Sequence, residues 1–397
     1  MYIIEGAAFL MADLLNKLRM LDAAPKKPVP KPVEPKETRA FYHSQHLFPV
    51  SLFCDQSHAE PKLLESLFGC SFPEKVEPED ILFLDTETTG LSGGVGTVAF
   101  EIGVGYFTHS GFAVEQFLMH DYPEEPDMLN ALNALMKRFP IICTFNGRTF
   151  DIPLLRSRFL MNRVPHPNIP EVHADVLHPA RRLWKLRLKR CNLGHLEEEL
   201  LHVVREDDLP GALVPQTYFQ YLKDGDFAPI ERILEHNKQD IVSLAQLFYF
   251  MCQQASAPEQ IEHGEDLFSL ARAMEKRGEK DKAIRCYRLS AAGSMRPQAF
   301  QALARIEKSA GHTEAAVKLY QTMLRQGDDP VFACEALAKL YEHQLRDIPG
   351  ALSYTRQALL LLSEPTLFRD ETSQEKQNML QYRYSRLRRK LSAIHSK

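Results

Sequence analysis

The stretch "ILFLDTETTG", residues 81–90, decides the fold that we expect for this chain. The four apolar residues at its start predict a short buried strand, and two carboxylates, Asp85 and Glu87, stand at the end of that strand. Positions i and i+2 of a strand point to the same face, so these two side chains project side by side. Adjacent carboxylates repel each other unless a cation lies between them. Because hard divalent cations prefer oxygen ligands, the pair predicts a site for Mg²⁺ or Mn²⁺.

The segments that follow this strand predict an α/β fold, with a mixed sheet flanked by helices. Two apolar runs separated by the turn "THSG" predict an antiparallel ribbon, and helical and strand patterns come after it. The predicted elements are strands at 97–107, 113–120 and 141–145, and helices at 126–138, at 151–162 and within 177–253.

The two ends of the chain differ from this α/β region. Residues 8–22 predict a short amphipathic helix, and "AAPKKPVPKPVEPKE" after it predicts a linker. In the last third, three similar segments align at Ala283, Ala316 and Ala351, which gives a period of about 34 residues. That period predicts all-α helical repeats of the tetratricopeptide type, with small residues where paired helices approach each other. We therefore expect three regions: residues 1–45, the helix and linker; 46–256, the α/β domain; and 257–397, the repeats.

Two further motifs each carry a carboxylate. In "TFNGRTFDIPLL" a strand ends, a turn follows, and Asp151 lies in the first turn of a helix. In "ILEHNKQDIVSL" His236 and Asp240 are four residues apart and therefore share one helical face. Taken alone, Asp151 predicts a helix cap, and the second pair predicts a solvated helix face. Together with Asp85 and Glu87 they predict two cations that activate water for phosphodiester cleavage, with His236 as the proton acceptor.

The three motifs "DTETTGL", "TFNGRTFD" and "HNKQD", in this order, resemble the exonuclease motifs of the DEDD superfamily, whose domains are DnaQ-like and RNase H-like. The resemblance matches Asp85 and Glu87 to the first pair of metal ligands. It matches Asp151 to the second site, Asp240 to the third and His236 to the proton acceptor. The superfamily has a tyrosine type and a histidine type, which differ in spacing. Here three residues separate His236 from Asp240, so histidine stands at the spacing of the tyrosine type.

Most of the chain is similar to the bacterial YprB family, also called the mitomycin repair factor B family. The similarity includes "DTETTGLSGGVGT", the proline-rich N-terminal segment and the C-terminal repeats. It implies removal of nucleotides from a 3′ end with two Mg²⁺ or Mn²⁺ ions, in DNA repair alongside a helicase or another repair protein. The residues themselves fit either DNA or RNA, and the resemblance favours DNA. The alternative is a scaffold that binds nucleic-acid ends without cleaving them and recruits such a partner through its repeats.

Basic clusters predict where nucleic acid is bound. The segment "ARRLWKLRLKR" holds six cations within ten residues, which can neutralise several phosphates. An exposed helix face without a ligand is the structural alternative, and Trp184 within the segment either stacks a base or belongs to the core. Arg148 lies between the turn and the helix of the second motif, where it can meet a phosphate. The residues predicted to bind nucleic acid are Arg148, Arg181, Arg182 and Lys185.

Two other groups have structural interpretations. The cluster "RYSRLRRK" at 383–390 predicts a solvated helix that caps the repeats. His173 and Asp175 lie near enough to the predicted sheet to support the site from behind.

Composition limits the remaining function classes. The net charge of −4 does not itself favour nucleic acid, so binding depends on the local clusters. No apolar run is long enough to span a membrane, and the N-terminus lacks the basic leader of a secretory signal. Seven single cysteines without a CxxC pair predict a protein of the reducing bacterial cytoplasm.

Overall fold

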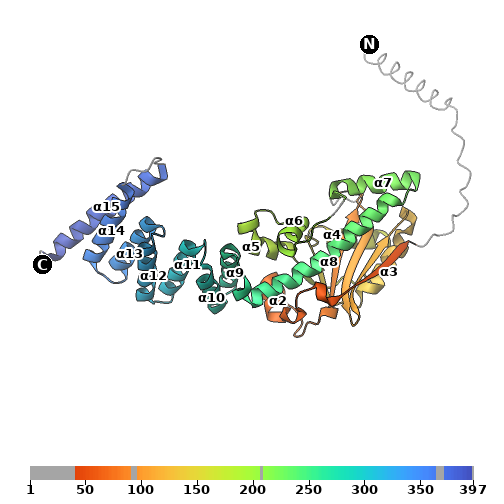
Figure 1. Ribbon diagram of the computed structural model, residues 1–397, viewed down its shortest axis with the longest axis horizontal. Helices are drawn as coiled ribbons and strands as arrows, with labels where there is room; N and C mark the ends of the chain where they lie inside the picture. The colour runs from red at the N-terminus through yellow and green to blue at the C-terminus, as the bar shows by residue number, and fades with distance from the viewer. Residues whose placement is uncertain (1–40, 91–95, 206–208, 364–370, 396–397) are drawn as a thin grey trace, which may run out of the picture. The chain divides into compact units, whose positions relative to one another are not determined.

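Figure 1 shows the protein as a computed structural model, which describes residues 41–90, 96–205, 209–363 and 371–395. The helix and linker expected between residues 8 and 40 lie outside the described residues. Residues from Phe41 onward form one unit. Across the described residues, no helix combines the length and the apolar character that a membrane crossing requires.

A six-stranded mixed sheet forms the centre of the α/β region, which confirms the predicted fold class. β2 (Ile81–Thr88) lies inside the sheet, antiparallel to β3 and parallel to β5. An interior position explains why its first half is a continuous apolar run. In spatial order the strands are β1 (Tyr42–Phe48), β4 (Gly111–Leu118), β3 (Ala99–Thr108), β2, β5 (Ile141–Thr144) and β6 (Val172–Asp175).

β3 and β4 form the predicted antiparallel ribbon around a tight turn. Thr108 pairs with Gly111, and the Thr108 hydroxyl donates to the carbonyl oxygen of Gly111 at 2.9 Å. Gly111 has a φ of 145°, and a Cβ there would lie 2.4 Å from the carbonyl oxygen of Phe48 in β1. Only glycine therefore lets β1 approach this turn. β1 extends across position 45, so the sheet starts before the boundary expected there.

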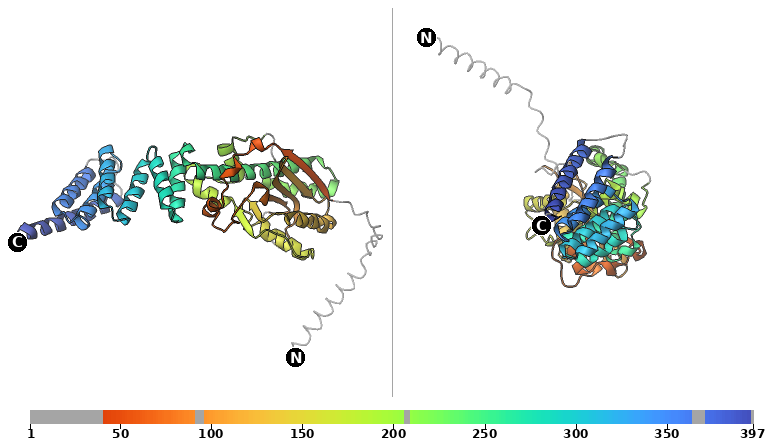
Figure 2. Two further views of the ribbon diagram at one scale, coloured as in Figure 1. Left: turned by 90° about the horizontal axis from the view of Figure 1, so that it is seen from below. Right: turned by 90° about the vertical axis from the view of Figure 1, so that its left-hand side faces the viewer.

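Alternate residues of β2 face two different cores. Leu82 and Leu84 pack in a core with α3 (Glu125–Met136) and α4 (Asp151–Met161). Phe83 faces the other way and packs on α8 (Ala228–Ser256), with its ring centroid 5.7 Å from that of Phe248. Figure 2 shows this long green helix running alongside the sheet. Because residues i and i+2 share a face, the carboxylates that follow Phe83 project towards α8.

The helices of the last third pack in consecutive pairs. Ala283, Ala316 and Ala351, the residues that align in the sequence, are each 0% exposed, so the paired helices approach closely there. The apolar core on the α8 side of the sheet continues into α9, α10 and α11. These helices are α9 (Gly264–Lys276), α10 (Lys280–Ser290), α11 (Arg296–Ser309), α12 (Thr313–Gln326), α13 (Pro330–His343), α14 (Ile348–Ser363) and α15 (Glu371–His395).

The basic cluster at 383–390 is solvated at Arg388 and Arg389, as predicted, but three of its cations also contact a buried carboxylate. Arg383, Arg386 and Lys390 of α15 donate to the Glu342 carboxylate of α13 at 2.8, 2.6 and 2.8 Å. The Glu342 side chain is 1% exposed, so the cluster compensates a buried charge. These contacts attach α15 to α13.

Candidate metal centre

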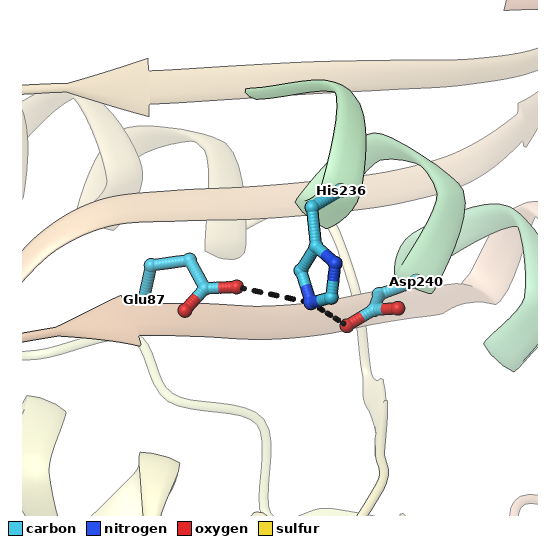
Figure 3. Close-up of side chains that lie close together, drawn as sticks. All are labelled: Glu87, His236 and Asp240. Atoms are coloured by element: carbon cyan, nitrogen blue, oxygen red, sulfur yellow. Dashed lines mark ion pairs between the residues drawn. The ribbon is translucent and has the colours of Figure 1, made fainter. Parts of the chain in front are cut away.

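Glu87, His236 and Asp240 each bring one side-chain atom into what we call the three-residue cluster (Figure 3). Those atoms lie within 4.8 Å of one another. Glu87 comes from the end of β2, beside a register shift in its pairing with β3, and the other two come from successive turns of α8. His236 Nε2 lies 3.8 Å from Glu87 Oε1 and 3.5 Å from Asp240 Oδ2. Two carboxylates and an imidazole at this spacing can hold a divalent cation.

Asp85 is a further acidic group at this point. Burial raises the pKa of Asp85 well above its usual range. The negative charges of Asp240, Asp151 and Glu87 raise that pKa further. Asn237 acts in the opposite direction, because its Nδ2 donates to Asp85 Oδ2 at 3.2 Å. The other three predicted carboxylates are therefore within electrostatic reach of Asp85.

A hydrogen-bond network that no sequence motif indicated orients Asn237. Gln116 of β4 donates through Nε2 to Asn237 Oδ1 at 3.3 Å and to Glu101 Oε1 at 2.9 Å. Because the amide oxygen of Asn237 accepts from Gln116, its amide nitrogen faces Asp85. Gly103 lies opposite Asp85 in the sheet, and a Cβ there would come within 1.9 Å of Asn237 Oδ1. Glycine at this position makes room for the amide.

Glu101 of β3 is a fifth carboxyl group beside the cluster. It lies opposite Glu87 in the sheet register and is 0% exposed. Burial raises the pKa of Glu101 well above its usual range, and the charge of Asp85 adds to this effect. Its Oε2 makes no hydrogen bond to any described residue. The hydrogen bond that Glu101 accepts from Gln116 acts in the opposite direction and favours its ionised form.

Asp151 begins α4 and is attached to β2 rather than joined to the three-residue cluster. Thr86 Oγ1 donates to Asp151 Oδ1 at 2.5 Å. Burial raises the pKa of Asp151 to about 6, although the Thr86 hydrogen bond acts to lower it. The alternative in which Asp151 is the helix cap is wrong, because Phe150 occupies the N-cap position.

The turn that precedes α4 is held by Asp175 of β6. The backbone N–H groups of Asn146 and Arg148 donate to its two carboxylate oxygens at 2.9 and 3.0 Å. Asn146 has a φ of 68°, a left-handed conformation that asparagine tolerates better than most residues. His173 adds a second contact, because its Nε2 lies 2.8 Å from the Thr144 hydroxyl. These contacts determine where α4 begins and therefore where Asp151 lies.

Arg205 is a charged residue of the site that no motif indicated. Its Nε and Nη2 donate to Glu197 Oε2 and Oε1 at 2.8 and 2.5 Å. Nη2 also forms an ion pair with Asp240, and Nη1 donates to His236 Nδ1 at 3.1 Å. Burial acts to lower the pKa of Arg205, but the carboxylates of Glu197 and Asp240 outweigh it and raise the pKa. Glu197 is the first residue of a π-helical turn, Glu197–Leu201, which separates it from Arg205. No local sequence pattern predicts this turn.

A pocket of about 580 Å³ opens beside the cluster. Arg205, His236 and Asp240 contribute to its wall, together with residues 192–194 and 203–204. The basic helix α5 (Leu177–Leu188) ends a few residues before this rim. Glu197 and Glu198 also line this pocket, so carboxylates form much of its wall.

The four residues predicted to bind nucleic acid have different surroundings. Arg181 and Lys185 are exposed on α5. Arg182 instead donates to a backbone carbonyl at the end of α2 (Pro61–Phe68). Arg148 donates through Nη2 to a backbone carbonyl of β6 at 2.9 Å. The last two side chains therefore also have a structural role.

Two further residues of the basic segment belong to the interior. Trp184 is 1% exposed, and its ring lies 6.1 Å from that of Phe250 in a stacked arrangement. The base-stacking interpretation of Trp184 is therefore wrong, and the core alternative is confirmed. Arg187 forms an ion pair of 2.7 Å with Asp266 of α9, which connects α5 to the helical region.

The donor atoms of the site fit a hard divalent cation. Glu87 and Asp240 offer carboxylate oxygens to a shared space, and His236 offers a ring nitrogen. Burial, followed by the negative charges of Asp240, Asp151 and Glu87, raises the pKa of Asp85. A divalent cation would stabilise the ionised carboxylates in this setting.

Comparison with known proteins agrees with the fold. Residues 82–252 match the RNase H superfamily. The chain is also 31% identical over 325 residues to the uncharacterized protein YprB of Bacillus subtilis (strain 168), which covers 79% of this chain and 76% of that protein. The chain therefore belongs to the same family as YprB, and its residues 82–252 form a domain similar to the RNase H superfamily. The predicted RNase H-like domain and the similarity to the YprB family are thereby confirmed.

Proposed function

We propose that this protein is a metal-dependent nuclease that hydrolyses phosphodiester bonds. The proposed ligands of two Mg²⁺ or Mn²⁺ ions are Asp85, Glu87, Asp151 and Asp240. The proposal rests on one observation. One potential ligand atom from each of Glu87, His236 and Asp240 lies within 4.8 Å of the other two, at the end of a central strand. Divalent ions bound there activate water and stabilise the leaving oxygen.

Residues of the chain prepare the site for this chemistry. His236 is the proposed acceptor of the proton from the attacking water, because its ring lies between Glu87 and Asp240 and imidazole exchanges protons near neutral pH. Asn237 donates to Asp85, and Thr86 donates to Asp151. Both hydrogen bonds favour the ionised carboxylates, the form in which carboxylates bind cations.

We infer that the substrate is DNA and that nucleotides are removed from a 3′ end in DNA repair. The order of the three motifs, which resembles that of DEDD exonucleases, supports this inference. The proposed nucleic-acid contacts are Arg148, Arg181, Arg182 and Lys185. Three of these residues lie on α5, whose end approaches the 580 Å³ pocket. The scattered cysteines favour action in the cytoplasm.

The proposed nuclease domain is the predicted region 46–256 extended back to the start of β1 at Tyr42, and residues 257–397 are the proposed tetratricopeptide-like repeats. The buried alanines at the aligned positions support the repeat assignment. Repeat surfaces of this type bind proteins, so the proposed partner is a helicase or another repair protein. The residues that precede β1 form the proposed N-terminal tail.

The test uses the purified full chain with Mn²⁺ and strands labelled at one end or the other, as DNA and RNA and as single strand and duplex. We expect DNA to shorten stepwise from its 3′ end. Asp85→Asn and Glu87→Gln should abolish this activity, because each replacement keeps the side-chain shape and removes the charge that a cation needs.

Glu231→Gln is the matched control, because Glu231 is an exposed carboxylate near the start of α8. That variant should cleave DNA at the wild-type rate. Full activity of Asp85→Asn would contradict the proposal. Binding of DNA ends without cleavage under all these conditions would favour the non-cleaving scaffold instead.

A further inference from the structure

Arg205 forms an ion pair with Asp240, a carboxylate that the proposed cations need as a ligand. Its Nη2 is paired with Asp240 Oδ1, while Asp240 Oδ2 faces His236 Nε2 at 3.5 Å. The side chains of Arg205 and Asp240 are each 14% exposed, so water screens their attraction only weakly. Asp240 therefore already has a monovalent cation of the chain beside it.

Glu197 keeps Arg205 at this place. Its side chain is 1% exposed and accepts from Arg205 Nε at 2.8 Å and from Nη2 at 2.5 Å. Two parallel hydrogen bonds of this kind hold a guanidinium group in a defined orientation. Because arginine stays charged at every working pH, the positive charge beside Asp240 is permanent.

The same guanidinium group determines how His236 can act. Arg205 Nη1 donates to His236 Nδ1 at 3.1 Å. A guanidinium group has no acceptor, so Nδ1 accepts and the hydrogen of the neutral ring lies on Nε2. Nε2 is the atom that faces Glu87 and Asp240. In this arrangement the hydrogen on Nε2 faces the two carboxylates, and Nε2 has no lone pair for a cation or a proton.

We propose that Arg205 is an internal competing cation that sets the affinity of this site for divalent ions. A divalent ion binds the Asp240 carboxylate only in competition with Arg205. His236 presents a lone pair at Nε2 only when its contact with Arg205 is broken. This inference rests on the proposed function in one respect, that Asp240 is a cation ligand.

A purely structural role for Arg205 makes the opposite prediction. In that case the residue only ties residues 203–205 to α8. Its removal would loosen the site, and divalent ions would bind more weakly. The direction of the change in affinity therefore separates the two roles.

The test is calorimetric titration of Mn²⁺ into the metal-free full chain. We expect Arg205→Gln to bind Mn²⁺ about tenfold more tightly than the wild type, because glutamine keeps a donor but removes the competing charge. Arg158→Gln is the matched control, because it also breaks a buried arginine–glutamate pair, the one with Glu125. That control should keep the wild-type affinity.

Each outcome of the titration decides something. Tighter binding by Arg205→Gln, or binding by that variant alone, supports the inference. Unchanged or weaker binding, with the Arg158→Gln control at the wild-type affinity, overturns the inference and leaves the nuclease proposal standing. No Mn²⁺ binding by the wild type or by Arg205→Gln overturns both.

A second measurement needs no Arg205 variant and holds even if that variant does not fold. Nitrogen NMR spectra of the histidine-labelled full chain report which ring nitrogen carries hydrogen, and His236→Gln assigns the His236 signals. We expect the hydrogen of His236 on Nε2 in the metal-free protein, and a change in its ring signals when Mg²⁺ is added. A hydrogen on Nδ1 in the metal-free protein contradicts the inference.

Discussion

The side chain of Asn237 fills the space above Gly103, where a Cβ would come within 1.9 Å of its Oδ1. The same amide donates to Asp85 at 3.2 Å. Asn237 comes from α8, and Gly103 comes from β3, the neighbour of the strand that carries Asp85. The close approach of helix and sheet at this glycine therefore brings α8 and its acidic residue to the end of β2.

Gly103→Ala should disturb the site through this contact. The added methyl group displaces the Asn237 amide from Asp85, and we expect a loss of about 1–3 kcal/mol in the free energy of unfolding, the usual cost of overpacking. Urea unfolding measures the stability, and Mn²⁺ titration should show weaker binding. Gly211→Ala is the control, because a Cβ at Gly211 meets no described atom within 4 Å. Equal stability of the two variants would contradict the expectation.

Thr86→Val should change the pH dependence of cleavage. The hydroxyl of Thr86 stabilises the ionised carboxylate of Asp151, whose pKa burial raises to about 6. Without that hydrogen bond the pKa of Asp151 rises further, so the carboxylate ionises only at higher pH. We expect the acidic limb of kcat/KM, measured with Mn²⁺, to move to higher pH.

Thr322→Val provides the comparison for this replacement. The Thr322 hydroxyl donates to the Lys318 carbonyl and accepts from Arg325 Nη2, each at 2.9 Å. Both partners belong to the same helix, far from Asp151 in the sequence, so the loss of this hydroxyl should leave the profile unchanged. An acidic limb at the wild-type position in Thr86→Val would show that Asp151 does not control cleavage.

His173→Gln should make the protein less sensitive to acid. Burial lowers the pKa of His173 from 6.5 to about 4. Between these two pH values the unfolded chain binds more protons than the folded protein, so stability decreases as the pH falls. We expect the replacement to remove on the order of 1 kcal/mol of the stability loss between pH 7 and pH 5, allowing for solvent screening.

Urea unfolding at the two pH values checks this expectation. His109→Gln is the control, because His109 is exposed in the turn between β3 and β4. An identical loss of stability in wild type and His173→Gln would show that another group causes the acid sensitivity.

Glu342→Gln should weaken the attachment of α15. Arg383, Arg386 and Lys390 all donate to this buried carboxylate, and without its charge they repel one another. We expect a local loss of about 1–3 kcal/mol, measured as faster amide hydrogen exchange in α15. Glu335→Gln breaks a surface pair with Lys339 on the same helix and should have little effect. Equal exchange in both variants would be evidence against this role of Glu342.

Local periodicity made part of the site predictable. Asp85 and Glu87 share a face because strand side chains alternate, and His236 and Asp240 share a face because they are one helical turn apart. The mixed sheet followed from apolar runs of strand length and from the turn "THSG". The two residues of each acidic pair, and the two strands joined by the turn, are close in the sequence, so one short pattern contains each of these relationships.

Other parts of the site depend on residues that are far apart in the chain. Gln116 orients Asn237 from another strand, and Arg205 reaches Asp240 from a loop. The environments of the two basic segments were also not predictable from the sequence. One segment buries Trp184 against Phe250, and the other contacts the buried carboxylate of Glu342, because whether a segment faces solvent or another helix depends on what packs against it.

The amino-acid sequence by itself determined the α/β class, the helical last third and the acidic residues worth examining, because apolar period and motif order are local properties. Only the tertiary structure decided which atoms meet. It joined Glu87, His236 and Asp240, attached Asp151 to Thr86, and placed Arg205 on Asp240. The physical reason is that electrostatic and hydrogen-bond energies depend on distances across the packed core, and chain folding sets those distances without leaving a repeating pattern in the sequence.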